Sequence, residues 1–182
     1  MLKSLFISLA LIFTAPLASA GQNGSSSAEA LVTTAAQEIA HSEQDHVADA
    51  VLSHIDTKAI ANFTLGRYGR ALPDADKARF ADAFEDFLRR QIDANAHQFA
   101  GVDVDIVNTS ARNPRDAIIT TELKTPQDRV KVRWRVIERG GKWSVVDLEI
   151  AGIWLAIEQR AQVSAMIARP GADIEDVIAQ FG

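Results

Sequence analysis

The chain has 182 residues with 19 basic and 24 acidic side chains, a net charge of −5, and no cysteine. Without cysteine it forms neither a disulfide bond nor a lipid-modified N-terminal cysteine, so its stability must come from a packed core. A net negative surface repels polyanions, which argues against nucleic acid as a partner.

Residues 1–20 have the pattern of a cleaved export signal. Lys3 supplies the positive end, residues 5–13 are an apolar run, and Ala18-Ser19-Ala20 is a small-residue cleavage site. Because the apolar run is shorter than the ~20 residues of a membrane span, we expect export and cleavage near Ala20 rather than anchoring. Removal of Lys3 leaves 18 basic and 24 acidic residues, a net charge of −6.

The exported chain is expected to form one domain. Residues 21–27 are rich in glycine and serine and predict a flexible lead-in. The remaining residues, 28–182, contain no internal repeat, and their number suits a single packed unit.

Four helices are predicted before the first strand. Alanine content and apolar spacing predict helices over residues 28–40 and 43–54. Asp56 is a good N-cap for a third helix, which ends near Arg67 and Arg70, where cations complement a helix C-terminus. Pro73-Asp74 opens the longest predicted helix, because proline and acid both suit a first turn.

The long helix carries one apolar stripe with helical spacing. Its members are Phe80, Phe84, Phe87, Leu88 and Ile92. The same residues are expected whether the stripe packs in an ordinary core or lines a pocket, so two readings remain open at this point.

After Gly101 the apolar period changes from helical to alternating, which predicts an antiparallel meander of four strands. The first predicted strand starts at Val102, and the other three cover residues 117–124, 130–138 and 142–150. Turns are predicted at Pro126-Gln127-Asp128 and Gly140-Gly141. In the third strand Val132 and Trp134 share the buried face, while Lys131, Arg133 and Arg135 form a basic row on the other face.

The fourth strand has an ambiguous phase. Trp143 and Val145 alternate onto one face, whereas Val146, Leu148 and Ile150 fall on the other. Either both faces are covered or a β-bulge shifts the phase.

Gly152 follows the fourth strand, and a helix is predicted to begin at Ile153. Its apolar stripe includes Ile157, Val163 and Ile167, and Arg160 lies on the same stripe. A guanidinium there must pair with an acid such as Asp147 or sit at the mouth of a cavity. A short helix over residues 173–181 completes an α+β domain.

Two blocks of sequence resemble the MlaC family, also called toluene-tolerance proteins. The segment Phe63-Thr-Leu-Gly-Arg-Tyr-Gly-Arg70, followed by the Phe-rich helix, is similar to that family's leucine-glycine-arginine region. The run Trp143-Ser-Val-Val-Asp147, then Gly152 and a helix with an arginine, is similar to its C-terminal signature.

The resemblance implies a monomeric periplasmic phospholipid carrier. In that family a strongly twisted sheet and helices partly enclose an apolar cavity for the two acyl chains. The implied partners are phospholipid, an outer-membrane lipoprotein complex and an inner-membrane ABC transporter complex, and the implied role is maintenance of outer-membrane lipid asymmetry.

Three departures from the family pattern leave other ligands open. Trp154 replaces a serine, Glu158-Gln159 replaces an asparagine-tyrosine pair, and Gly69 replaces an aromatic residue. The alternatives are a hopanoid or another hydrophobic ligand, an isomerase-type enzyme with Asp103, Asp105 or Asp147 as base, and a purely structural envelope protein.

The apolar faces of the predicted elements give a set of lipid-binding candidates. They are Leu65, Tyr68, Phe80, Phe84, Phe87, Leu88, Val104, Ile106, Val132, Trp134, Ile153 and Ile157. Arg67, Arg70, Arg160 and Asp147 are candidates for contact with a headgroup or for structural roles.

The sequence predicts no catalytic residue, metal or cofactor. His41, His46, His54 and His97 lack the spacing and company of a zinc site. No nucleophile elbow, phosphate loop or dinucleotide motif is present.

Overall fold

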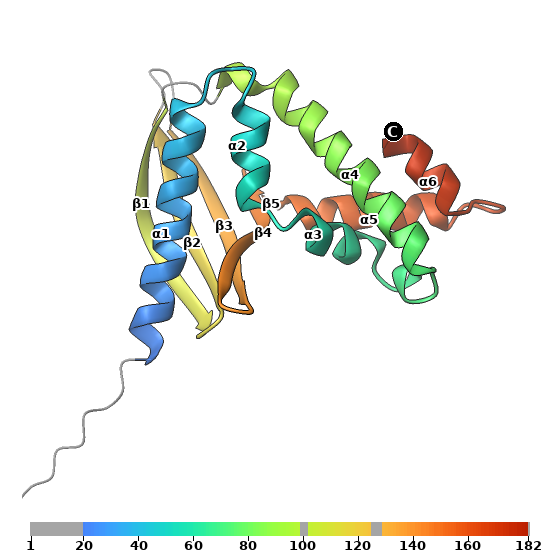
Figure 1. The fold of residues 1–182 in the computed structure, drawn as a ribbon, viewed down its shortest axis with the longest axis horizontal. Coiled ribbons are helices and arrows are strands. Elements are labelled where there is room, and N and C mark those ends of the chain that lie inside the picture. The colour runs from blue at the N-terminus through green and yellow to red at the C-terminus, as the bar shows by residue number, and fades with distance from the viewer. Residues whose placement is uncertain (1–19, 99–101, 125–128, 182) are drawn as a thin grey trace, which may run out of the picture.

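A computed structural model of the chain describes residues 20–98, 102–124 and 129–181 (Figure 1). The predicted signal peptide therefore lies outside the described residues except for Ala20, and so does the turn predicted at residues 126–128. The helices are α1 (Ala20–His41), α2 (Val47–His54), α3 (Thr57–Leu65), α4 (Asp74–Ala94), α5 (Leu155–Ile167) and α6 (Ile174–Phe181), with short 3₁₀ turns at Tyr68–Arg70 and Ala96–Gln98. The strands are β1 (Asp103–Asn113), β2 (Asp116–Lys124), β3 (Arg129–Arg139), β4 (Lys142–Ile150) and β5 (Ile153–Trp154).

The first helix is longer than predicted. Helix α1 includes residues 21–27, which the sequence predicts to be a flexible lead-in. Within this segment, a Cβ at Gly24 would lie 2.7 Å from the carbonyl oxygen of Pro114. Glycine thus lets the helix approach the β1–β2 turn closely. With 22 residues α1 also exceeds the 21 residues of α4.

The sheet has five antiparallel strands in the order β1-β2-β3-β4-β5, one more than predicted. The additional strand contains Ile153 and Trp154, which pair with Ile150 and Glu149 after a tight turn. Ala151 and Gly152 form that turn with positive φ angles of 52° and 84°. Ile153 is therefore part of a strand, and α5 begins two residues later than the predicted helix.

A β-bulge resolves the phase of β4. Arg135 pairs with Asp147 and Val136 pairs with Val145, so Val146 is the extra residue. Leu148 and Ile150 consequently share the face of Val145. Of the two alternatives that the sequence leaves open, the bulge is confirmed.

Strand β1 is at the edge of the sheet and departs twice from regular pairing. Its register with β2 shifts between Ile106 and Asn108 and again between Ala111 and Asn113. Val107, at the first shift, is 50% exposed. The alternating pattern of Val102, Val104 and Ile106 is therefore interrupted as soon as the strand passes Ile106.

The buried side chains form two clusters. The first lies between α1, α2 and one face of the sheet and includes Val32, Val47, Ile119, Val136 and Val145. The second lies among α3 to α6, beyond the β4–β5 end of the sheet, and includes Leu65, Phe80, Phe84, Val163 and Phe181. Helix α4 belongs to both, because Ile92 packs against the first cluster.

Candidate functional site

An apolar pocket of about 370 Å³ lies between the inner face of the sheet and the helices α1, α2 and α4. Its lining is aliphatic and aromatic except for Gln91 and Asn95 on α4. The lining residues are Ala36, Ile39, Ala40, Val51, Ile55, Leu88, Gln91, Ile92, Asn95, Val102, Val104, Leu123, Val132, Trp134, Leu148, Ile150 and Leu155. Such a surface binds hydrocarbon, because it offers van der Waals contact and almost no polar partner.

Four of the predicted lipid-binding residues line the apolar pocket. They are Leu88, Val104, Val132 and Trp134. The indole N–H of Trp134 donates to Thr121 Oγ1 at 2.9 Å, so its polar atom is satisfied inside the sheet and its ring can face hydrocarbon.

The other predicted lining residues lie elsewhere. Leu65, Phe80 and Phe84 are fully buried in the helical cluster, where Phe84 also lines a small recess next to the apolar pocket. Phe87 packs against Phe181. Tyr68 lies in a separate surface depression with Arg67 and Arg70, and Ile106 lies beside α1 in another. Ile153 and Ile157 are each 54% exposed, and they line neither the apolar pocket nor the small recess next to it.

Helix α4 explains why the predicted stripe divides. The stripe is continuous, but its N-terminal half packs against α3 and α6 and its C-terminal half borders the apolar pocket. Leu88 is near the division, and one turn later Ile92 lines the pocket. Sequence periodicity defines the stripe, whereas only the tertiary arrangement decides what it faces.

Sequence reasoning missed several lining residues on the sheet. Leu123 follows Ile119 and Thr121 on one strand face, so strict alternation along β2 could have found it. The sequence left open which face of β4 Leu148 and Ile150 occupy, and only the bulge places them on the face that lines the pocket. Leu155 lines the pocket at the start of α5, where Ile153 and Ile157 were predicted to do so.

A smaller recess of about 70 Å³ adjoins the apolar pocket and shares Ile55, Leu88, Leu148 and Leu155 with it. Asp147 lines the recess and is only 7% exposed. Its Oδ1 accepts the N–H groups of Leu148 at 2.8 Å and Ala156 at 2.9 Å. Burial raises the pKa of Asp147 above its ordinary value, against the opposing effect of these two hydrogen bonds.

Asp147 thus caps the N-terminus of α5, a role that needs only an acceptor oxygen. The other two candidate bases, Asp103 and Asp105, are exposed on β1, where Asp105 pairs with Lys124.

Arg160 does not form the predicted pair with Asp147. Its guanidinium lies over the ring of Phe63, with Cζ 5.0 Å from the ring centroid, and the residue is exposed. In the predicted stripe of α5, Val163 is buried and Ile167 packs against the helical cluster, whereas Ile157 is exposed and Ala156 is buried instead. Arg160 consequently borders α3 rather than the apolar pocket.

We expect Gly66→Ala to lower the free energy of unfolding by about 1–3 kcal/mol. Gly66 has φ 57° and ψ −129°, a conformation that glycine adopts readily and alanine does not. A Cβ there would also lie 3.0 Å from Arg160 Nε. Urea denaturation measures the loss, and the double variant with Arg160→Ala separates the backbone cost from crowding. A loss below about 0.5 kcal/mol, the range of ordinary surface substitutions, would contradict the assigned backbone conformation.

Most of the cations predicted as headgroup or docking candidates have local partners. Arg133 pairs with Glu149 at 2.6 Å, and Arg135 pairs with Asp116 at 3.0 Å. Lys131 lies opposite Glu122 in the sheet. Arg67 donates to Tyr68 Oη at 3.0 Å and stacks over that ring. The basic row is therefore largely neutralised, and none of these side chains lines the apolar pocket.

One exposed group of possible metal ligands occurs among the residues that the structure describes. Atoms of Glu43, Asp45 and His46 lie within 4.8 Å of one another at the α1–α2 connection. His54 instead contacts Glu38, with 2.6 Å between Nε2 and Oε2. Over the described ranges, no helix has the length and apolar character needed to cross a membrane.

The fold is that of small α+β proteins in which helices cover an antiparallel sheet around an apolar pocket. A family model described as "MlaC protein" matches residues 26–181, and the chain belongs to the MlaC family. This confirms the resemblance seen in the sequence. No curated protein matches the sequence significantly.

A solved structure with a similar fold is the phospholipid-binding protein of Ralstonia solanacearum in complex with a phospholipid. The TM-score is 0.74 at 16% sequence identity, and the match covers 87% of this chain and 94% of that one. At this identity the likeness supports the α+β fold, which agrees with the predicted fold class.

Proposed function

We propose that this protein is a periplasmic phospholipid carrier that passes lipid between an outer-membrane lipoprotein complex and an inner-membrane ABC transporter. The observation that carries the proposal is the apolar pocket between the sheet and α1, α2 and α4. Membership of the MlaC family and the phospholipid bound in the Ralstonia solanacearum structure support it. The assignment is to a binding and transport protein rather than an enzyme.

The pocket meets the physical requirement of lipid transport through water. Each methylene exposed to water costs about 0.8 kcal/mol, so acyl chains need a dry enclosure in transit. Transfer from a bilayer into an equally apolar pocket is nearly neutral, which makes loading reversible. The volume of about 370 Å³ is at the lower end of ligand pockets, so we expect the pocket to widen when two chains enter.

Native mass spectrometry of protein purified from its own envelope tests the proposal. A bound mass equal to that of a phospholipid supports the carrier function. A bound mass equal to that of a hopanoid would show that the ligand is the alternative one and not a phospholipid. Uniformly empty protein would contradict lipid binding altogether.

We expect Val104→Trp to reduce bound lipid about tenfold, because overpacking the pocket costs roughly 1–3 kcal/mol. Val104 lines the pocket from the edge strand β1, where it is half-buried and faces Leu123. The matched control is Val107→Trp on the same strand, since Val107 is exposed and does not line the pocket. Quantification of extracted lipid per protein is the measurement. Equal lipid loss in both variants would mean that the pocket is not the binding site.

A further inference from the structure

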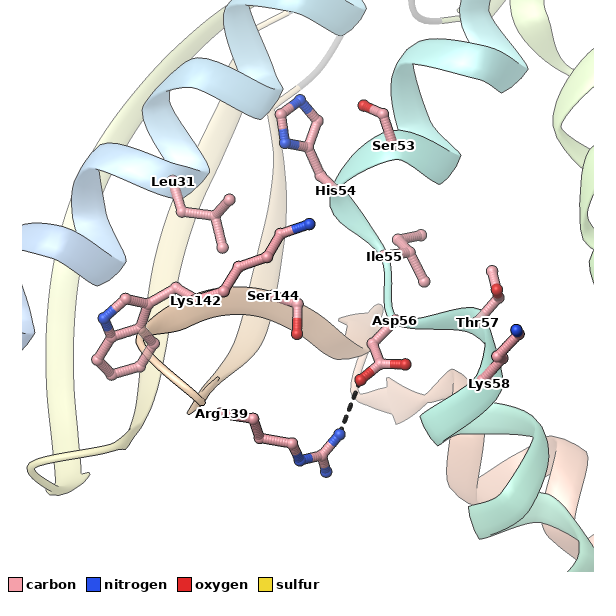
Figure 2. Close-up of a pocket in the computed structure, with 11 residues that line it drawn as sticks. Leu31, Ser53, His54, Ile55, Asp56, Thr57, Lys58, Arg139, Lys142 and Ser144 are labelled. Carbon is pink, nitrogen blue, oxygen red and sulfur yellow. Dashed lines mark hydrogen bonds and ion pairs between the residues drawn. The ribbon is translucent and has the colours of Figure 1, made fainter.

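A second concavity, here called the polar cleft, lies where the β3–β4 hairpin meets the connection between α2 and α3 (Figure 2). Its volume is about 320 Å³. Arg139 and Lys142 approach it from the two strands, and Asp56 and Lys58 approach it from the helical side. It is more polar than the apolar pocket, and its charged side chains suit a charged ligand rather than hydrocarbon.

The polar cleft is cationic in a chain whose net charge is −5. Lys58, Arg139 and Lys142 line it against one carboxylate, Asp56, which leaves an excess of two positive charges. Asp56 is already occupied, because Oδ1 accepts the N–H of Ala59 at 2.9 Å and Oδ2 accepts Arg139 at 2.8 Å. Within the described ranges no acid forms an ion pair with Lys58 or Lys142.

The walls of the polar cleft also offer apolar surface. Leu31, Ile55 and Trp143 line it beside the lysines. A free small anion would use only the charges, whereas a peptide that carries both carboxylates and aliphatic side chains would use both kinds of surface. The volume is sufficient for a few side chains but not for a folded element.

We propose that the polar cleft docks an acidic segment of a partner protein. The carboxylates of that segment pair with Lys142 and Lys58, and its aliphatic groups pack on Trp143 and Leu31. The basic row Lys131, Arg133 and Arg135 is a poorer site for such a partner, because Glu149 and Asp116 already neutralise its two arginines. This proposal does not depend on the identity of the lipid.

The docking site shares a wall with the apolar pocket. Ile55 lines the polar cleft, the apolar pocket and the small recess between them. The backbone N–H of Asp56 donates to the carbonyl of Val145 at 2.9 Å, which fixes this connection to β4. A partner segment in the cleft would therefore contact the segment that walls the apolar pocket.

The three tryptophans provide a test by NMR of ¹⁵N-labelled protein. The probe is a blocked peptide of alternating leucine and glutamate, and the control probe has glutamine in place of glutamate. We expect the glutamate peptide to shift the indole N–H signal of Trp143, which lines the cleft. The signals of Trp134, bonded to Thr121, and Trp154, stacked on Arg133, should stay in place.

Lys142→Gln should weaken binding of the glutamate peptide about three- to fivefold, which is the effect expected for the loss of one exposed ion pair. The matched control, Lys131→Gln on β3, should leave affinity unchanged. Added salt should weaken binding further. Equal effects of the two variants, equal binding of the glutamine peptide, or an equal Trp143 shift with inorganic phosphate would each overturn the proposal. Lipid content is not measured, so failure here leaves the carrier function intact.

Discussion

Replacement of Phe80 by alanine is expected to lower the free energy of unfolding by about 3–5 kcal/mol. Phe80 is fully buried and meets Phe84 and Phe181 with ring centroids 5.9 and 5.6 Å apart. Its removal leaves a cavity where α4 packs on α6, and α6 has only eight residues to hold it there. Urea denaturation of the purified protein measures the loss.

Phe63→Ala is the matched control for this prediction. Phe63 is 39% exposed and contacts the guanidinium of Arg160, so its removal should cost about 1 kcal/mol or less. If the two variants lost similar stability, the helical cluster would not be the packed core that the structure assigns.

A second large effect is expected at Asp147. Asp147→Ala should lower stability by about 1–2 kcal/mol, because the N–H of Ala156 loses its acceptor at the start of α5. Asp147→Asn keeps an acceptor oxygen and removes the buried charge, so it should retain most of the stability at neutral pH.

The pH dependence of the Asn variant tests the same carboxyl group. Because burial raises the folded-state pKa of Asp147 above the ordinary value of 3.8, the folded protein binds this proton more tightly than the unfolded chain does. That stabilisation is fully present below pH 3.8 and is lost as pH rises through the raised folded pKa. The wild-type protein should therefore lose stability over the range above pH 3.8 relative to Asp147→Asn. Parallel curves for the two proteins would contradict the burial of an ionisable group at this position.

Local sequence patterns predicted the order and type of nearly every long element. The N-cap at Asp56 is confirmed, since its side chain accepts the N–H of Ala59. Alternation in the third strand correctly placed Val132 and Trp134 on the buried face. These features depend on residues close together in the chain, which is why periodicity and capping could find them.

The errors concern features that depend on distant residues. The short strand β5 pairs Ile153 with Ile150 across a two-residue turn, and two residues are too few for an alternating pattern to indicate a strand. The side of α5 that is buried depends on the helices packed against it, so Ile157 was placed on the wrong face. The pocket itself joins residues from both ends of the chain, beyond the reach of any local pattern.

The irregular edge of the sheet has a consequence for aggregation. A regular edge strand offers a row of backbone groups on which another chain can add a strand and begin aggregation. In β1 the exposed Val107 coincides with a register shift, so this exposed apolar side chain lies where the backbone pairing is irregular. Asp103 adds negative charge before it. The edge that helps to form the apolar pocket is thereby a poor template for a second chain.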